Sequence, residues 1–270
     1  ELATGLVKSP DGYWLSSKSS SVSYPDSGSD TCFAVEDDSF WFAHRNGIIT
    51  TAMAHFPPPG IVFDVGGGNG FVTAGMVNAG FPSILVEPSL SGIANARTRG
   101  LENSICSTLG DAGFPDNSLP AIGLFDVLEH VEDDRAFLSH LHRLLQPGGR
   151  IYLSVPAFNW LWSADDVRAG HFRRYRSRTL EERLRESGFR VDYSTYFFSH
   201  LVVPLFLKRS LLSHVGLRKR DIDTTSTREH RQKSRPTQKV LKVLSSRETK
   251  RISALKRIPF GTSCLAIASK

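Results

Sequence analysis

The stretch that decides the fold is Ile61-Val62-Phe63-Asp64-Val65-Gly66-Gly67-Gly68-Asn69-Gly70. Its first half is apolar and rich in β-branched residues, which is typical of a buried strand in a parallel sheet. Its second half is glycine-rich, and glycine lets the backbone turn sharply and approach a ligand closely. A helix that follows such a turn directs exposed N–H groups at the same place. The stretch therefore predicts a nucleotide-type binding site, although a tight turn without a ligand has the same pattern.

Strand and helix patterns alternate outward from this stretch. Further strands are predicted at residues 83–87, 104–107, 121–126, 150–155, 191–198 and 263–268. Helices are predicted at residues 38–55, 90–98, 133–146 and 179–187. Such alternation with short loops predicts an α/β fold with a doubly wound, mostly parallel sheet. Ligands of such sheets bind at the carboxyl ends of the strands, so the residues after each strand are the candidates for chemistry.

Composition predicts one catalytic domain with additions. The chain has 270 residues, of which 40% are hydrophobic, enough for one large core. Cys32, Cys106 and Cys264 have none of the spacings of zinc or redox motifs, so we expect a reducing compartment. No apolar run reaches the roughly 18 residues of a membrane-spanning helix, and residues 1–30 lack the apolar stretch of a signal peptide. We therefore expect a cytoplasmic protein, with peripheral membrane attachment as an alternative.

Four segments are predicted along the chain: an irregular leader at 1–35, a catalytic core at 36–199, an apolar and then basic insertion at 200–260, and a final strand at 261–270. Residues 218–257 hold 14 Lys and Arg but four Asp and Glu, a balance of +10 against +6 for the whole chain. Apolar residues at 197–207 precede this basic run, and the combination favours contact between residues 197–257 and an anionic membrane surface. A buried helix with a basic loop is the alternative. No nucleic-acid partner is expected, because no aromatic-basic repeat or nucleic-acid motif is present.

Acidic residues follow the second and third predicted strands. Glu87 lies 17 residues beyond Gly70, where a carboxylate can accept hydrogen bonds from two ribose hydroxyls. Gly110-Asp111-Ala112 follows the next strand, where an Asp side chain can hold an adenine amino group. Each acid alone has an ordinary explanation as a solvated strand end or a turn residue. Their joint spacing with the glycine turn indicates a nucleoside-bearing cofactor.

Two further stretches belong with these motifs: Phe125-Asp126-Val127-Leu128-Glu129-His130-Val131 and Leu145-Gln146-Pro147-Gly148-Gly149. Together they resemble the core of the class I S-adenosylmethionine-dependent methyltransferases. The resemblance covers about residues 36–200. It implies a Rossmann-like, seven-stranded sheet whose last strand, at 263–268, is antiparallel.

The resemblance also implies the cofactor, S-adenosylmethionine, and its site. The glycine turn underlies the methionine part, Glu87 binds the ribose and Asp111 contacts the adenine. Phe40-Trp41-Phe42-x-x-Arg45 is similar to the helix that closes over the cofactor, although core packing explains it equally well. The predicted cofactor-binding residues are Asp64, Gly66, Gly68, Gly70, Glu87, Asp111, Ala112 and Arg45.

Candidate catalytic residues follow the fourth and fifth strands. Methyl transfer requires an aligned acceptor and, for a hydroxyl, removal of its proton. We expect His171 and Tyr175 to face the acceptor, with His171 as general base and His130 nearer the cofactor. The rival interpretation is that all three are structural. The surrounding loop, with Leu161-Trp162-Ser163 and Gly170-His171-Phe172-Arg173-Arg174-Tyr175, resembles that of a bacterial methyltransferase subgroup. In this chain Trp160 and Trp162 are expected to form an acceptor wall or a packed lid, and Arg173 and Arg174 an anion site or structural ion pairs.

Asp126, Glu129 and His130 resemble the Asp-x-x-Glu-His arrangement with which ubiquinone-pathway O-methyltransferases hold a divalent ion. Relatives without a metal carry a similar segment, so no metal is assigned. The function expected is methyl transfer from S-adenosylmethionine to an oxygen of a small or lipid-like acceptor. The alternatives are a nucleotide-dependent oxidoreductase on a related sheet and a non-catalytic, membrane-associated module that kept the fold.

Overall fold

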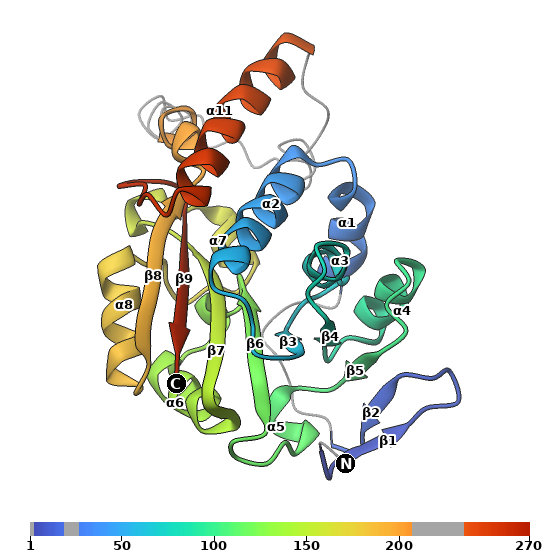
Figure 1. Ribbon diagram of the computed structural model, residues 1–270. Helices are drawn as coiled ribbons and strands as arrows, with labels where there is room; N and C mark the ends of the chain where they lie inside the picture. The colour runs from blue at the N-terminus through green and yellow to red at the C-terminus, as the bar shows by residue number, and fades with distance from the viewer. Residues whose placement is uncertain (1–2, 19–26, 207–234) are drawn as a thin grey trace.

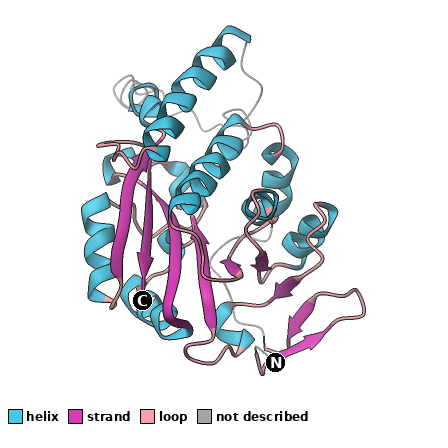
Figure 2. Cartoon of the chain, in the orientation of Figure 1, coloured by secondary structure: helices cyan, strands magenta, loops and turns pink. Residues whose placement is uncertain are grey.

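The computed structural model describes residues 3–18, 27–206 and 235–270, which build one sheet with helices on both faces (Figures 1 and 2). The strand order is β1-β2-β5-β4-β3-β6-β7-β9-β8. The seven strands predicted from the sequence are β3 (Val62–Val65), β4 (Ser83–Val86), β5 (Ser104–Cys106), β6 (Leu119–Phe125), β7 (Leu145–Pro156), β8 (Arg190–Phe197) and β9 (Ser263–Ser269).

The order of the strands reverses at β3. This strand pairs in parallel with β4 on one side and with β6 on the other. β9 lies antiparallel between β7 and β8. The predicted doubly wound, mostly parallel sheet with an antiparallel last strand is therefore confirmed, and the carboxyl end of β3 is the point where such sheets bind ligands.

The sheet has nine strands instead of seven, because the leader adds a hairpin. β1 (Leu6–Lys8) and β2 (Trp14–Ser16) pair antiparallel, and β2 continues the sheet in parallel with β5. The turn at Gly12 has a φ of 94°. The leader was expected to be irregular, and this is wrong for residues 6–16, because its turn formers close a hairpin on the open edge of β5. The helix α1 (Ser27–Glu36) also lies in the leader.

Two helical layers cover the sheet, as successive strand residues show. Ile151 and Leu153 of β7 pack with one cluster of apolar residues, while Tyr152 between them packs with the other. The first cluster includes residues of α6 (Asp134–Leu144) and α8 (Ser177–Glu186). The second includes residues of α2 (Phe40–His55), α3 (Phe71–Asn78) and α11 (Arg235–Ser253). The shorter elements are α4 (Leu90–Thr98), α5 (Leu109–Ala112), η1 (Leu128–His130), η2 (Asn159–Leu161), α7 (Ala164–Arg168) and η3 (Ser199–Leu201).

One buried acid fastens the predicted insertion to the core. Glu248 of α11 is 3% exposed and lies 2.7 Å from Nε2 of His44 on α2. It also accepts hydrogen bonds from the backbone N–H groups of Phe198 and Ser199 at the end of β8. Residues 207–234 of the predicted membrane-contact segment lie outside the described residues, whereas 197–206 and 235–257 are described. Among the helices of the described ranges, none combines the length and apolar character needed to cross a bilayer.

Candidate active site

The glycine turn after β3 is shaped for close approach by a ligand. Gly66, Gly68 and Gly70 all have positive φ, between 56° and 70°. A Cβ at Gly66 would lie 2.9 Å from Val127, and one at Gly70 would lie 2.5 Å from Leu101. A Cβ at Gly68 would meet nothing within 4 Å. The turn therefore packs tightly on both sides and leaves open space at its centre, as a bound cofactor requires.

Glu87 lies at this turn, immediately after β4. One carboxylate oxygen accepts the N–H of Gly68 at 2.9 Å, and the other accepts the N–H of Ser89 at 2.9 Å. Burial raises the pKa of Glu87, and these two hydrogen bonds partly offset that effect. Since a carboxylate has about four acceptor positions, both oxygens can also accept ribose hydroxyls. The structure thus holds the Glu87 carboxylate against the glycine turn.

Asp64 and Arg45 lie behind the turn. Asp64 is fully buried in β3 and accepts a 2.6 Å hydrogen bond from the hydroxyl of Thr73 on α3. Burial raises the pKa of Asp64 to about 6. Arg45 of α2 forms a 3.0 Å ion pair with Asp126 after β6, and its guanidinium lies 5.2 Å from the centre of the Trp41 ring. Asp64 therefore supports the turn from within the protein, whereas Arg45 is held by Asp126.

The predicted adenine end lies at α5. The Asp111 carboxylate accepts a 2.8 Å hydrogen bond from the Thr108 hydroxyl, and Ala112 is fully buried. The leader reaches this point, since the Ser16 hydroxyl donates to the Asp111 carbonyl at 3.1 Å. The N–H of Gly5 donates to the Ala112 carbonyl at 3.3 Å. The hairpin that sequence reasoning missed thus supports the backbone of the predicted cofactor site.

A second contribution missed from the sequence is Glu36 at the end of α1. It is 6% exposed and accepts hydrogen bonds from Asn69 of the glycine turn and from Arg99. The Arg99 guanidinium also lies 5.0 Å from the centre of the Phe71 ring. No local pattern indicates this arrangement, because Glu36 and Arg99 lie 63 residues apart.

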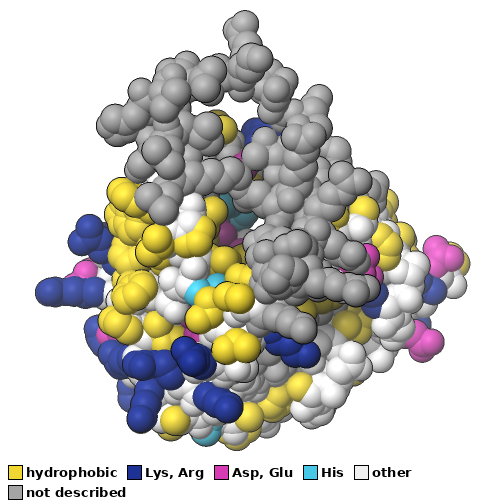
Figure 3. All heavy atoms as spheres, turned by 90° about the horizontal axis from the view of Figure 1, so that it is seen from above, with side chains coloured by type: hydrophobic (Ala, Val, Ile, Leu, Met, Phe, Trp, Pro, Cys, Tyr) yellow, Lys and Arg dark blue, Asp and Glu magenta, His cyan; other side chains and the backbone are white. Residues whose placement is uncertain are grey.

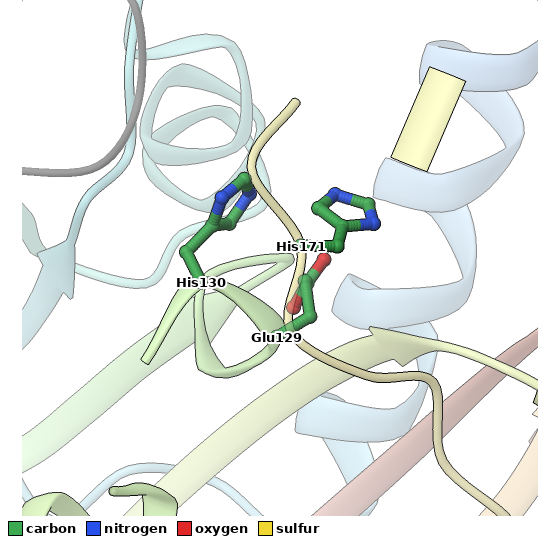
Figure 4. Close-up of side chains that lie close together, drawn as sticks. All are labelled: Glu129, His130 and His171. Atoms are coloured by element: carbon green, nitrogen blue, oxygen red, sulfur yellow. The ribbon is translucent and has the colours of Figure 1, made fainter. Parts of the chain in front are cut away.

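On the predicted acceptor side, Glu129 and His130 of η1 meet His171 from the loop after α7 (Figure 4). One ligand atom from each of the three residues lies within 4.8 Å of the other two. The two imidazole rings are 4.6 Å apart and nearly perpendicular. Burial and the neighbouring His171 lower the pKa of His130 to about 4. Burial, with Asp126 nearby, raises the pKa of Glu129 well above its usual value.

Asp166 of α7 orients His171. Its carboxylate lies 2.9 Å from Nδ1 of His171 and accepts hydrogen bonds of 2.7 and 3.0 Å from Arg174. Burial alone would raise the pKa of Asp166, but its bonds with His171 and Arg174 hold that pKa well below the usual range. The ionised carboxylate therefore accepts a hydrogen bond from Nδ1–H of His171, which favours the tautomer with the lone pair on Nε2. Asp166 was not predicted as a site residue, although it lies only five residues before His171 in the sequence.

Tyr175 does not face an acceptor. It is 2% exposed, and its hydroxyl donates a 2.9 Å hydrogen bond to Asp134 of α6. Burial and the adjacent Asp134 raise its pKa. The expectation of a catalytic Tyr175 is therefore contradicted, because the ring turns into the core and ties the loop to α6. The arginines likewise form structural ion pairs, Arg173 with Asp134 at 3.0 Å and Arg174 with Asp166.

The ligand set implied by the Asp-x-x-Glu-His resemblance is not assembled. Asp126 accepts a hydrogen bond from Ser154 and pairs with Arg45, so both of its oxygens face other partners. His171 stands in its place beside Glu129 and His130. The physical reason is that Ser154 and Arg45 hold the Asp126 carboxylate, in a turn between β6 and η1 where the φ of Asp126 is 57°.

The strand order, the glycine turn and the acid after β4 together define the class I fold of the S-adenosylmethionine-dependent methyltransferases. A family model described as a methyltransferase domain matches residues 43–194. The chain belongs to this family.

Relatives agree with this assignment. The chain is 26% identical over 171 residues to a protein of Mycolicibacterium smegmatis named probable S-adenosylmethionine-dependent methyltransferase, covering 62% of this chain and 66% of that one. It is 32% identical over 100 residues to the ubiquinone biosynthesis O-methyltransferase of Xanthomonas oryzae, covering 35% of this chain and 42% of that one. The matches thus span less than two thirds of either relative.

A solved structure shares the fold. It is phosphoethanolamine N-methyltransferase 2 of Haemonchus contortus in complex with S-adenosyl-L-methionine, with a TM-score of 0.56 and 16% identity. The alignment covers 91% of this chain and 57% of that one.

Proposed function

We propose that this chain transfers the methyl group of S-adenosylmethionine to an oxygen atom of a small or amphiphilic acceptor. The observation that carries the proposal is the position of Glu129, His130 and His171. They lie on the same carboxyl edge of the sheet as the glycine turn, after β6 and β7. A methyl group held over the glycine turn and an acceptor held over these three residues would meet at this edge.

The proposed reaction is an in-line displacement. The acceptor oxygen forms a bond to the methyl carbon while the carbon–sulfur bond breaks, so the sulfonium becomes a neutral thioether. The acceptor hydroxyl also loses its proton, and this loss is assisted at the Glu129–His130–His171 group. Of the three residues, His171 contributes most to the loss of this proton, because Asp166 holds its ring in one orientation.

The surface around this group supports an amphiphilic acceptor. Figure 3, which views the molecule from this end, shows hydrophobic side chains gathered around histidine side chains, beside a group of Lys and Arg side chains. Trp160, Trp162 and Phe172, from the loop that bears His171, are 37 to 48% exposed. The oxygen specificity of the Xanthomonas relative favours oxygen as the methylated atom here.

Contact with an anionic membrane remains part of the proposal for residues 197–257. Val203 and Phe206 are 61% and 49% exposed and would favour such contact. Flotation with neutral and anionic vesicles tests it, and binding that is absent or insensitive to salt and lipid charge would contradict it.

Calorimetry and a transfer assay test the main proposal. S-adenosylhomocysteine should bind and NAD(H) should not, which separates the methyltransferase from the rival oxidoreductase. S-adenosylmethionine with a labelled methyl group should then label a product in a cell extract, and product analysis should place the label on oxygen. A label on nitrogen or carbon would refute the oxygen specificity, and NAD(H) binding without S-adenosylhomocysteine binding would refute the whole proposal.

A further inference from the structure

We infer that Glu129, His130 and His171 form a binding site for a divalent transition-metal ion, with Zn²⁺ as the ion that fits best. Two imidazoles and one carboxylate, with a fourth position open, are the ligand set of many catalytic zinc sites. The three ligand atoms lie within 4.8 Å of one another (Figure 4). Ligands bound at about 2.0 to 2.2 Å from one ion stand less than 4.4 Å apart, so small side-chain movements would close the site.

A buried carboxylate oxygen supports the inference independently. Glu129 is 1% exposed, and its Oε2 atom has no hydrogen-bond partner among the described residues. A buried acceptor left unsatisfied costs about 1 to 3 kcal/mol, so such groups usually have a partner that is not part of the protein chain. A bound cation would satisfy this oxygen.

The residues behind His171 have the arrangement of an outer ligand shell. Metal-binding histidines commonly donate the other ring N–H to a carboxylate, which fixes the tautomer and the direction of the ligating nitrogen. Asp166 accepts from Nδ1 of His171 in this way and is itself held by Arg174. Nε2 of His171 is consequently the nitrogen available to an ion.

This ligand set differs from the one that the sequence resemblance implies. Replacing Asp126 by His171 changes two oxygens and one nitrogen into one oxygen and two nitrogens. Mg²⁺ prefers oxygen ligands, whereas Zn²⁺ accepts imidazole readily. The structure therefore favours a transition-metal ion over Mg²⁺ at this position.

The chemical role of the ion rests on the proposed function. An acceptor hydroxyl at the open position would ionise more easily, because a bound divalent cation stabilises the oxyanion. Its proton would leave to solvent, and the oxyanion would then attack the methyl carbon. In this arrangement His171 is a ligand instead of the general base expected from the sequence.

Metal binding is tested on the full chain after treatment with a chelator. Calorimetry with ZnCl₂ and the visible absorption of added Co²⁺ should show one ion per chain. Glu129→Gln and His171→Asn should each weaken binding by more than tenfold, and Asp166→Asn by about tenfold to hundredfold. Glu132→Gln and His140→Asn, which alter an acid and a histidine outside the group, should bind as the wild type does. Absence of stoichiometric binding, or equal binding by all five variants, would overturn the inference.

The proposed ion site and the proposed methyltransferase function can be refuted independently of each other. Metal-free protein that binds S-adenosylhomocysteine and transfers methyl groups at the full rate would overturn the role of the ion and leave the proposed function intact. Zn²⁺ binding that depends on Glu129 and His171, in a protein with no affinity for S-adenosylhomocysteine, would support the site and refute the function.

Discussion

The cofactor side and the acceptor side of this site are built in different ways. Gly68 and Glu87 each follow their own strand at neighbouring positions in the sheet and are joined by one hydrogen bond. Glu129 and His171 come from separate loops, and the orientation of His171 depends on a third residue, Asp166. The pairing of Gly68 with Glu87 is visible in the spacing of the sequence, whereas the meeting of Glu129 with His171 and Asp166 is visible only in three dimensions.

The largest effect is expected from a substitution on the acceptor side that leaves the cofactor side unchanged. His171→Asn should lower turnover by about 10² to 10⁴, the usual range for loss of a proton-transfer group, and a lost metal ligand would also act on this step. The affinity for S-adenosylhomocysteine should not change, because the glycine turn and Glu87 are untouched. Single-turnover methyl transfer and calorimetry measure the two quantities. Loss of cofactor affinity would show that the two sides are not independent.

The next largest effect is expected on the free energy of unfolding, from Asp64, the buried acid of the cofactor side. The pKa of Asp64 is about 6 in the folded chain against 3.8 as the ordinary value. Because the folded value is the higher one, stability from this group is full below pH 3.8 and is lost as the pH rises through 6. The free energy of unfolding of wild type relative to Asp64→Asn should therefore fall by about 3 kcal/mol between pH 3.5 and pH 7. Urea unfolding of both chains across this range measures it, and a pH-independent difference would contradict the shift.

Glu87→Ala should weaken cofactor binding without altering the acceptor side. The ribose would lose a charge-assisted acceptor worth about 1.5 to 3 kcal/mol, so the Kd for S-adenosylhomocysteine should rise about tenfold to hundredfold. Turnover at saturating cofactor should stay near that of the wild type. Glu102→Ala, an exposed acid after α4, is the matched control. Unchanged affinity in a folded Glu87→Ala chain would remove Glu87 from the site.

The smallest expected effect concerns Tyr175. Tyr175→Phe removes the hydrogen bond to Asp134 and should lower the free energy of unfolding by about 1 to 2 kcal/mol. Turnover at a temperature where the chain is folded should be unaffected, since the hydroxyl points into the core. Thermal unfolding and initial rates test the two parts. A drop in turnover of a hundredfold or more would restore Tyr175 to the acceptor side.

The parts of the fold that could be predicted are those whose pattern lies within a short stretch of the sequence. Strands, the glycine turn and the apolar stripe of α6 depend on residues close in sequence, so their positions follow from periodicity and turn chemistry. Glu248 is a contrasting case, because one acid in a strongly basic run anchors α11 to His44 across 204 residues. Tyr175 shows a second limit, since its place in the loop was predicted but the direction of its side chain depends on Asp134.

The hairpin β1–β2 has a consequence for the behaviour of the protein in solution. β5 is three residues long, and β2 pairs with the edge that it would otherwise expose. A chain shortened to begin at residue 36 would present the unpaired N–H and C=O groups of β5 to other molecules. Exposed edges of this kind recruit strands from neighbouring chains, so the shortened protein should self-associate and aggregate as its concentration rises. In the described sheet β2 covers the edge of β5, and the short strand β1 forms the edge on that side instead.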